Sequence, residues 1–210
     1  MTFQVVDGVY EDMDAFNIIE RDSYSDSPLE GVLFKSAQEG SSSFKDQTDR
    51  NIKQWKEDPA TLYFKVIDTA SSNEIVAFAE YKLYDESNLQ LLSYPTAADV
   101  PRIFGDSANH EAAGDFFGGL WAGQVLQKLN TAPKHQKRGA GSMLVQKGCD
   151  IADRRGLLAG LEASPMGAPL YKKHGYVEKQ VVKFDPKKYG RDADIHISLC
   201  MTREPVRQPE

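Results

Sequence analysis

The chain has 210 residues, of which 40% are hydrophobic, 27% charged and 10% aromatic, and its formal net charge at pH 7 is -6. This composition is typical of a soluble globular protein and predicts a single domain over residues 1–210 with a buried core. It excludes collagen, coiled coils and disulfide scaffolds. A membrane protein is also excluded, because no apolar stretch approaches the roughly 18 residues that span a bilayer. The acidic balance argues against a general nucleic-acid binder, which is usually basic.

The cysteines, the histidines and the first residues give no sign of a metal site or of export. Cys149 and Cys200 form no CxxC pair, so we expect two buried, reduced thiols and a cytoplasmic location. The segment MTFQVVDGVYEDMD lacks the basic and apolar regions of a secretory signal. The four histidines are scattered, and we expect no bound metal. We expect His135 and His174 in exposed loop or helix-end positions, and His196 in a sheet.

The first part of the chain is predicted to form a strand, two helices and an antiparallel pair of strands. Residues 75–84 alternate between two faces, as a half-buried strand does, and the turn-like TASSN precedes them. Loop residues SDSP and GSSS separate the two helices. In chain order, the expected elements are a strand at 3–6, helices at 11–23 and 43–57, and strands at 62–68 and 75–84.

The second part of the chain begins with a long insert at about 86–121 and then alternates strands with helices. The expected elements are a strand at 123–131, a helix at 139–155, a strand at 157–162, a helix at 168–174, strands at 176–184 and 195–201, and a frayed tail from about 204. Gly156 is expected to end the long helix in a left-handed conformation. In the last strand, Ile195, Ile197, Leu199 and Met201 are expected to point inward, and His196, Ser198 and Cys200 to the other face. This order predicts a mixed sheet with helices packed on it.

A basic, glycine-containing junction between a strand and the long helix predicts a phosphate site. The segment QKRGAG contains Gly139 and Gly141 in the loop that leads into the helix, with Lys134, Lys137 and Arg138 close by. A helix N-terminus presents free N–H groups and the positive end of a dipole, and glycine lets an anion approach the backbone. The dinucleotide fingerprint fails at Leu144, and the nucleotide P-loop GxxxxGK[ST] is absent. The remaining pattern is Q-x-x-G-x-G.

This pattern, with Gln136, Gly139 and Gly141, resembles the pyrophosphate loop of the GNAT acetyltransferase superfamily. A second resemblance follows in 162-EASPMGAPLYKKHGY-176, where Leu170 and Tyr171 precede a Gly-aromatic pair. The form LEASPxGxPLYxxxGY is most similar to a subfamily common in fungi. The two motifs and the strand order cover roughly residues 60–202.

The resemblance implies the GNAT fold, an α/β (α+β) architecture. Its centre is a mixed, mostly antiparallel, twisted sheet of about six to seven strands, flanked by helices and splayed between strands four and five. It also implies direct transfer of an acetyl group from acetyl-CoA to a primary amine. Non-catalytic acyl-CoA binding or sensing on the same fold is an alternative, as is acetylation of a protein or peptide amine. A nucleotide-binding protein would need the motifs that are missing.

The resemblance also implies roles for particular residues. The backbone N–H groups from Arg138 to Ser142 would hold the pyrophosphate with help from the Lys137 and Arg138 side chains. Leu129–Thr131 would bind the pantetheine arm. The Leu129 N–H would stabilise charge on the thioester oxygen, and Tyr171 would be the general acid that protonates the leaving thiolate. Ser164 stands where many relatives carry Asn. The residues implied for cofactor binding are Leu129, Asn130, Thr131, Gln136, Lys137, Arg138, Gly139, Ala140, Gly141, Ser142, Ser164 and Lys173.

A general base is not identified by the sequence. The candidates are Glu80, Glu162, His110 and Glu111, with water as an alternative, and Glu80 is expected to be an edge carboxylate that faces water. Where some relatives carry a catalytic acid or histidine, this chain has Gln124 and Gln127.

The acceptor is expected to be a small-molecule amine, because no long charged groove is visible, and no nucleic-acid or membrane partner is expected. The insert is expected either to form a lid suited to a cationic amine or to anchor a helix in the core. Its aromatic and acidic residues are Tyr94, Phe104, Phe116, Phe117, Trp121, Asp106, Glu111 and Asp115. The protein is expected to be a monomer or a homodimer.

Overall fold

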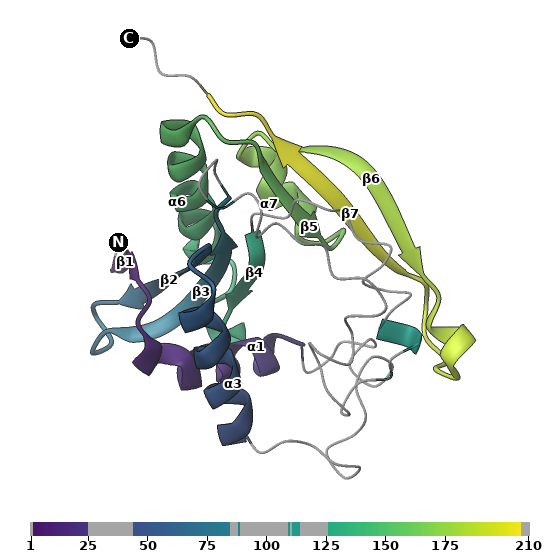
Figure 1. The fold of residues 1–210 in the computed structure, drawn as a ribbon, viewed down its shortest axis with the longest axis horizontal. Coiled ribbons are helices and arrows are strands. Elements are labelled where there is room, and N and C mark those ends of the chain that lie inside the picture. Colours follow the sequence, from purple (N-terminus) through teal and green to yellow (C-terminus); the bar gives the residue numbers. More distant parts are fainter. Residues whose placement is uncertain are drawn as a thin grey trace.

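The alternating apolar segments form one sheet, in which each strand lies beside a partner that is often distant in sequence (Figure 1). The computed structural model describes residues 2–24, 44–84, 88, 109, 111–113 and 126–206. Within them, seven strands follow the order β1-β2-β3-β4-β5-β7-β6. The strands are β1 (Phe3–Asp7), β2 (Thr61–Asp68), β3 (Glu74–Lys82), β4 (Leu126–Thr131), β5 (Ala159–Ala163), β6 (Val177–Phe184) and β7 (His196–Arg203).

Four α-helices and three short 3-10 helices connect these strands. The α-helices are α1 (Met13–Tyr24), α3 (Phe44–Glu57), α6 (Ala140–Arg155) and α7 (Ala168–Lys173). The 3-10 helices are η1 (Tyr10–Asp12), η5 (Pro133–His135) and η6 (Pro186–Tyr189). All of these counts refer to the part of the chain that the structure describes. The order agrees with the expected order of strands and helices.

The sheet is antiparallel except between β4 and β5, which run parallel. These two strands pair only at Leu126 and Leu161, whereas β4 pairs with β3 along most of its length. Beyond that point the described parts of β4 and β5 separate. The predicted mixed sheet, splayed between its fourth and fifth strands, is therefore confirmed.

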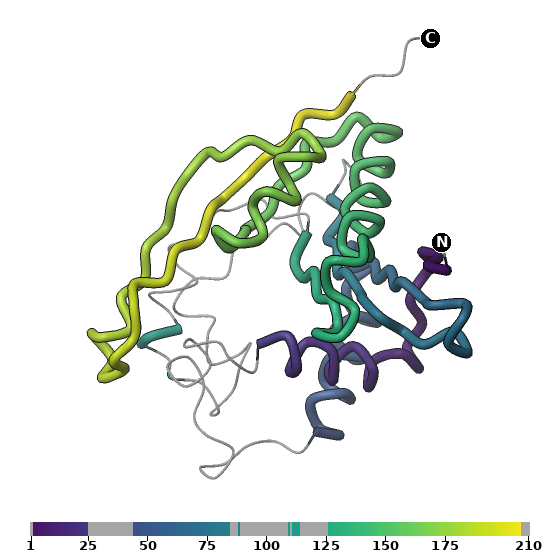
Figure 2. Tube along the Cα trace, turned by 180° about the vertical axis from the view of Figure 1, so that it is seen from behind, coloured from purple at the N-terminus to yellow at the C-terminus, as the bar shows by residue number. Residues whose placement is uncertain are grey.

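Helices cover both faces of the sheet, so two apolar cores form (Figures 1 and 2). On one face α6 packs on β2 and β3 through Leu144 and Val145, which are almost completely buried. On the other face α1 buries Met13 and Phe16 against Tyr63 and Phe78. The ring of Phe16 stacks on Phe78 with 4.7 Å between the ring centroids. Because both faces are covered, the central strands are apolar on both sides.

The long helix α6 begins and ends at glycines with left-handed backbone conformations. Gly139 precedes it with φ of 95°, and Gly156 follows it with φ of 65°. The predicted left-handed end at Gly156 is confirmed. Leu157 N–H donates to Ala152 O at 2.9 Å, so it still belongs to the turn that ends the helix. The next strand therefore begins at Ala159 rather than at the expected residue 157.

The predicted faces of the last strand are partly wrong. Ile195 lies outside β7 and is 54% exposed, whereas Ser198 and Cys200 are buried. Four consecutive residues of β7, from Cys200 to Arg203, are buried, so both of its faces are covered along this part of the strand. Cys149 and Cys200 are both free and buried, as expected.

Several expectations fall on residues outside the described part of the chain. These are most of the insert at 86–121, with all of its named aromatic residues, residues 123–125 of the expected fourth strand, and residues 207–210. Where the chain is described near its C-terminal end, Val206 N–H donates to Asp153 Oδ1 at 2.7 Å. Among the described helices, none has both the length and the apolar character needed to cross a membrane.

The contact between α6 and β3 depends on Gly148. A methyl group at this position would lie 2.6 Å from the Tyr81 hydroxyl and ring, which is closer than side chains approach one another. The same hydroxyl donates to Leu144 O at 3.0 Å, so it cannot move away without losing this bond. We expect Gly148→Ala to lower the free energy of unfolding by about 1–3 kcal/mol, as overpacked cores do. Urea denaturation measures the change.

Gln146→Ala is the control for this substitution, because Gln146 is exposed on the same helix. We expect it to change stability by no more than about 0.5 kcal/mol. An equal loss in the two variants would contradict the Gly148 assignment.

Candidate active site

The predicted phosphate loop has the backbone geometry of an anion site. Lys137 and Gly139 have left-handed backbone conformations, with φ of 60° and 95°. No side chain caps the start of α6 at Gly139. Within the described part of the chain, the N–H groups of Ala140, Gly141 and Ser142 have no backbone acceptor. Free N–H groups and the helix dipole together favour a negatively charged ligand here.

Gly141 lies where three of the predicted cofactor-binding elements meet. A methyl group at Gly141 would be 3.5 Å from Leu170 Cδ2, 3.7 Å from Thr131 Oγ1 and 3.9 Å from Leu129 Cδ2. The start of α6, the end of β4 and helix α7 therefore enclose one small region. The sequence motifs at 136–142 and 162–176, which are separated in the chain, are neighbours in the structure.

The last residues of β4 have one edge paired and one edge turned toward the splay. Leu129, Asn130 and Thr131 pair with Ala79, Phe78 and Ala77 of β3. On the other side, β4 pairs with β5 only at Leu126, within the described residues. An extended ligand could add to this edge as a further strand does.

A buried amide lies on the same part of β4. Asn130 is 3% exposed, and its Nδ2 has no hydrogen-bond partner in the described structure. A buried donor without an acceptor costs free energy, so this atom is available to a ligand or to bound water.

The basic side chains of the loop are directed differently from one another. Arg138 packs over the Phe3 ring at 4.5 Å and reaches His135 Nδ1 at 2.5 Å and Asp68 Oδ2 at 3.3 Å. Lys137 is exposed. The Arg138 guanidinium is thus held toward β1 and β2. The backbone N–H is the part of Arg138 that remains in the loop for an anion.

His135 is buried, and its expected exposed position is wrong. It packs edge-to-face on Phe3, and its Nε2 lies 3.5 Å from Glu74 Oε2. His135 is the last residue of the 3-10 helix η5, directly before the loop. Nearby, Gln136 Nε2 lies 3.5 Å from Thr131 O, so Gln136 links the loop to the end of β4.

Helix α7 is joined to the start of α6 by a hydrogen bond. Ser142 Oγ and His174 Nε2 are 2.8 Å apart, and burial, together with the positive charge of Arg203, lowers the pKa of His174. Ser164 Oγ accepts the Gly167 N–H at 3.1 Å, which fixes the turn that leads into α7. Lys173 is exposed at the end of this helix. Ser164 therefore lies in the turn before α7, and Lys173 is the last residue of this helix.

Tyr171 is buried in α7 and packs against Tyr176. The two ring centroids are 6.0 Å apart with an interplanar angle of 68°, and Tyr171 is 7% exposed. Burial raises the pKa of Tyr171, and the negative charge of Glu162 and the nearby Tyr24 raise it further. The phenol is therefore protonated at neutral pH, which is the state that a proton donor requires.

The candidate bases have very different surroundings. Glu80 does not face water, because its side chain is only 12% exposed beside Tyr63 of the α1-side core, and its Oε2 accepts a hydrogen bond from Tyr63 at 2.7 Å. Glu162 lies half-buried on β5 and acts electrostatically on Tyr171. Glu111 is exposed, and His110 and Gln124 lie outside the described residues.

The sequence did not point to Lys128 and Glu20, which the structure brings together beside β4. Lys128 Nζ lies 3.0 Å from Glu20 Oε2 and 3.9 Å from Glu80 Oε2. The alternation of Lys128 and Asn130 along β4 was a signal that these two side chains share a face, opposite Glu80 and Phe78 of β3. The contact with α1 had no sequence signal, because Glu20 is 108 residues away.

The sequence profile described as the acetyltransferase (GNAT) family matches residues 30–176, more than half of the chain. The chain belongs to this family. The resemblance of QKRGAG and of the segment around Tyr171 to GNAT proteins is thereby confirmed at the family level, and the protein is a GNAT N-acetyltransferase. The finer resemblance to a fungal subfamily stays a prediction.

Solved GNAT structures share the fold over almost the whole chain. An acetyltransferase from Corynebacterium glutamicum, described as histone acetyltransferase HPA2 and related acetyltransferase, has a TM-score of 0.66 and 18% identity, with 100% of both chains covered. A ribosomal-protein alanine N-acetyltransferase from Escherichia coli has a TM-score of 0.55 and 14% identity, covering 99% of this chain and 97% of its own. A spermidine N-acetyltransferase chimera that includes the Vibrio cholerae enzyme has a TM-score of 0.56 and 12% identity, covering 97% and 96%. A search of curated proteins gave no significant match.

The two glycines of the GNAT loop are predicted to respond oppositely to alanine. Gly139 has a positive φ, so Gly139→Ala should lower the free energy of unfolding by about 1–2 kcal/mol through backbone strain. Gly141 does not have a positive φ, and a methyl group there meets its neighbours at ordinary contact distances. Gly141→Ala should therefore leave stability unchanged or raise it by up to about 1 kcal/mol, because alanine favours the helix.

Urea denaturation of the two variants tests this difference. Each serves as the control for the other, since both add one methyl group to the same loop. Equal effects, or a larger loss at Gly141, would contradict the backbone assignment.

Proposed function

We propose that this GNAT protein transfers the acetyl group of acetyl-CoA to the primary amine of a small molecule by direct attack on the thioester. The observation that carries this proposal is the convergence of the α6 N-terminus, the β4 edge and α7 around Gly141. GNAT acetyltransferases generally use acetyl-CoA, and this region offers the anion site and strand edge that such a substrate requires.

The residues present fit coenzyme A. The backbone N–H groups from Arg138 to Ser142 would hold the pyrophosphate, with Lys137 adding positive charge. The edge of β4 at Leu129, Asn130 and Thr131 would bind the pantetheine arm. The unpartnered, buried Asn130 Nδ2 supports a polar ligand beside this edge. Gln136 would add to this site from the loop, and Ser164 and Lys173 from the two ends of α7.

Acetyl-CoA supplies an activated acetyl group, and two residues of the chain would assist its transfer. The Leu129 N–H would donate to the carbonyl oxygen as negative charge develops there, a contribution that is typically worth a few kcal/mol. Tyr171 would give its phenolic proton to the departing thiolate. Burial and the charge of Glu162 keep the pKa of Tyr171 above its ordinary value, so the proton is retained until the thiolate forms.

The proton of the attacking ammonium would leave through water or Glu162. Among the described candidates, Glu162 is the carboxylate whose charge acts on Tyr171. Glu80 is less suited, because it already accepts a hydrogen bond from Tyr63 and lies near Lys128.

A compact acceptor is favoured by the position of α1. Ser23 Oγ near the end of α1 donates to Ile19 O at 2.7 Å and lies 3.3 Å from Thr131 O, and Lys128 bonds Glu20 of the same helix. These contacts hold α1 against the end of β4. An acceptor amine that reaches β4 from the α1 side would therefore have limited space. One structural relative is named as acting on spermidine, a small amine. The two free cysteines suit a reducing compartment such as the cytoplasm.

Acetyl-CoA is expected to stabilise the protein against heat. At about 100 times its Kd, a ligand adds roughly 2.7 kcal/mol, which for a chain of this size raises Tm by about 5–10 °C. Differential scanning fluorimetry measures the shift, with ATP and NAD as controls that should give none. The absence of a shift with acetyl-CoA would overturn the assignment of the loop.

Removing the Tyr171 hydroxyl is expected to slow transfer without loosening the cofactor. In Tyr171→Phe, kcat for thiol release with an amine panel should fall about 100-fold or more, because the general acid is lost. The Kd for acetyl-CoA should change by less than about threefold, since the ring remains packed on Tyr176.

Tyr176→Phe is the matched control, because its ring lies in the same cluster but has no catalytic role here. Its kcat should stay within about fivefold of the wild type. Equal losses in both variants would show a packing effect rather than acid catalysis. Stabilisation by acetyl-CoA without thiol release from any amine would favour an acyl-CoA-binding protein.

A further inference from the structure

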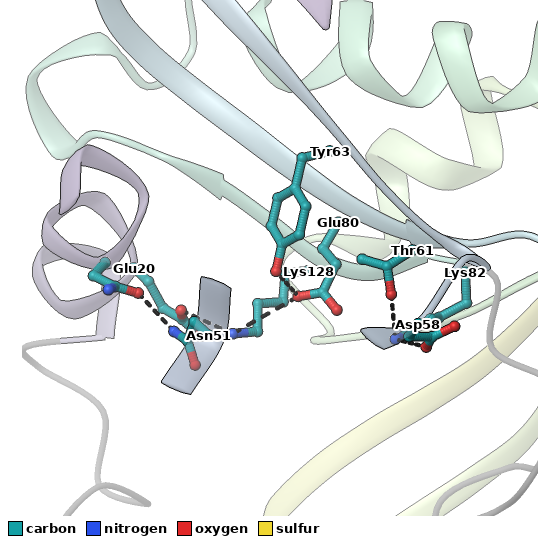
Figure 3. Close-up of polar contacts among 9 residues, drawn as sticks. Glu20, Asn51, Asp58, Thr61, Tyr63, Glu80, Lys82 and Lys128 are labelled. Atoms are coloured by element: carbon teal, nitrogen blue, oxygen red, sulfur yellow. Dashed lines mark hydrogen bonds and ion pairs between the residues drawn. The ribbon is translucent and has the colours of Figure 1, made fainter. Parts of the chain in front are cut away.

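Lys128 is a cation held between two carboxylates on the α1 side of β4 (Figure 3). Its Nζ lies 3.0 Å from Glu20 Oε2 and 3.9 Å from Glu80 Oε2. Lys128 and Glu80 are directly opposite one another on neighbouring strands. Burial opposes the charge of Lys128, but Glu20 and Glu80 outweigh it and raise the pKa, so the ammonium stays protonated.

Lys128 is the sequence neighbour of a residue of the proposed reaction centre. Lys128 directly precedes Leu129, whose N–H is the proposed donor to the thioester oxygen. The register of β3 and β4 shifts at Gln127, which places an extra residue between Lys128 and the last pairing of β4 with β5 at Leu126. Such bulges re-aim neighbouring side chains and are frequent beside active sites.

The group formed by Lys128, Glu20 and Glu80 also has an electrostatic connection to Tyr171. Burial raises the pKa of Tyr24, Glu20 and Glu162 raise it further, and Lys128 lowers it. Tyr24 in turn acts on the pKa of Tyr171. Glu20 and Lys128 are therefore linked to the proposed general acid through Tyr24 at the end of α1.

The group remains open to solvent and carries an excess of negative charge. The side chains of Lys128 and Glu20 are 32% and 24% exposed. The formal charges of Glu20, Glu80 and Lys128 add to one negative charge. One ammonium from a substrate would balance it, whereas a second would meet the Lys128 ammonium. Without Lys128, the same carboxylates would attract a doubly charged amine.

We propose that Lys128 determines acceptor specificity by occupying the Glu20 and Glu80 carboxylates, so that the site favours amines with one positive charge over polyamines. This role rests on the proposed function, because it assumes that the acceptor approaches β4 from the α1 side. A purely structural ion pair between α1 and β4 would affect stability but not the preference for charge.

The test measures amine binding to the protein saturated with CoA, so that no turnover is needed. Isothermal titration calorimetry gives the Kd of butylamine and of putrescine, which has the same four-carbon chain and a second amine. The readout is the preference for putrescine, defined as the Kd of butylamine divided by the Kd of putrescine. We expect Lys128→Met to raise this preference about fivefold and Glu20→Gln to lower it by a similar factor, the scale of a partly exposed charge pair.

Lys82→Met is the matched control. Lys82 forms a similar, partly exposed ion pair with Asp58 beside Thr61, on β3 rather than β4 (Figure 3). It should leave the preference within about twofold of the wild type. Opposite changes in Lys128→Met and Glu20→Gln, with none in Lys82→Met, would support the proposal, and so would either change alone if the other variant does not fold.

If the preference for putrescine is unchanged in both Lys128→Met and Glu20→Gln, the role of Lys128 is overturned. An equal change in the Lys82→Met control would also overturn it. Failure of the wild type and of Lys128→Met to bind either amine would overturn it as well. Acetyl transfer is measured separately by thiol release. Loss of that activity with an intact binding preference would contradict the proposed catalysis and not the specificity role.

Discussion

The single pairing of β4 with β5 is the constraint on which the site depends. At Leu126 and Leu161 the two parallel strands meet, and beyond that point the described strands part. β3 keeps the other edge of β4 in register, and β7 keeps β5 in register, so neither strand can move to close the splay. Backbone groups exposed by such a separation need other partners, and an extended polar ligand can supply them.

The connection between the same two strands explains why the anion site lies there. Helix α6 links β4 to β5 and packs on the sheet through Gly148 and Tyr81. A crossover between parallel strands begins at the carboxyl end of the first strand, so the N-terminus of α6 must lie beside the end of β4. The anion site and the free strand edge are therefore two results of one connection. The left-handed Gly139 supplies the turn that makes the connection short.

Much of this arrangement could be predicted because its signals are local. The period of apolar residues marked the strands and α6, and glycines at 139, 141 and 156 marked the two ends of the helix. The family resemblance then joined QKRGAG to the segment around Tyr171, which the contacts of Gly141 bear out as neighbours. No comparison tests the individual roles of these residues, which stay proposals.

The failures concern partners that are distant in the chain. Glu80 was expected to face water, but its burial depends on Tyr63 of β2 and on the coverage of the sheet by α1. His135 was expected to be exposed, but Phe3 and Glu74 enclose it. The last strand was expected to have one covered face, but its residues from Cys200 to Arg203 are all buried, and the alternation of its residues does not reveal what packs on its second face.

The position of α1 follows from the same splay. Where β4 leaves β5, Ser23 Oγ lies 3.3 Å from Thr131 O and Glu20 bonds Lys128, so α1 supports β4 from one side. The side toward β5 has no such support in the described structure, and the proposed substrate would fill it. Binding there would add to stability as well as to catalysis, since a ligand that occupies only the folded state shifts the folding equilibrium. The charges of Glu20, Glu80 and Lys128 then have two effects, because the contacts that hold α1 in place also set the potential that an incoming ammonium meets.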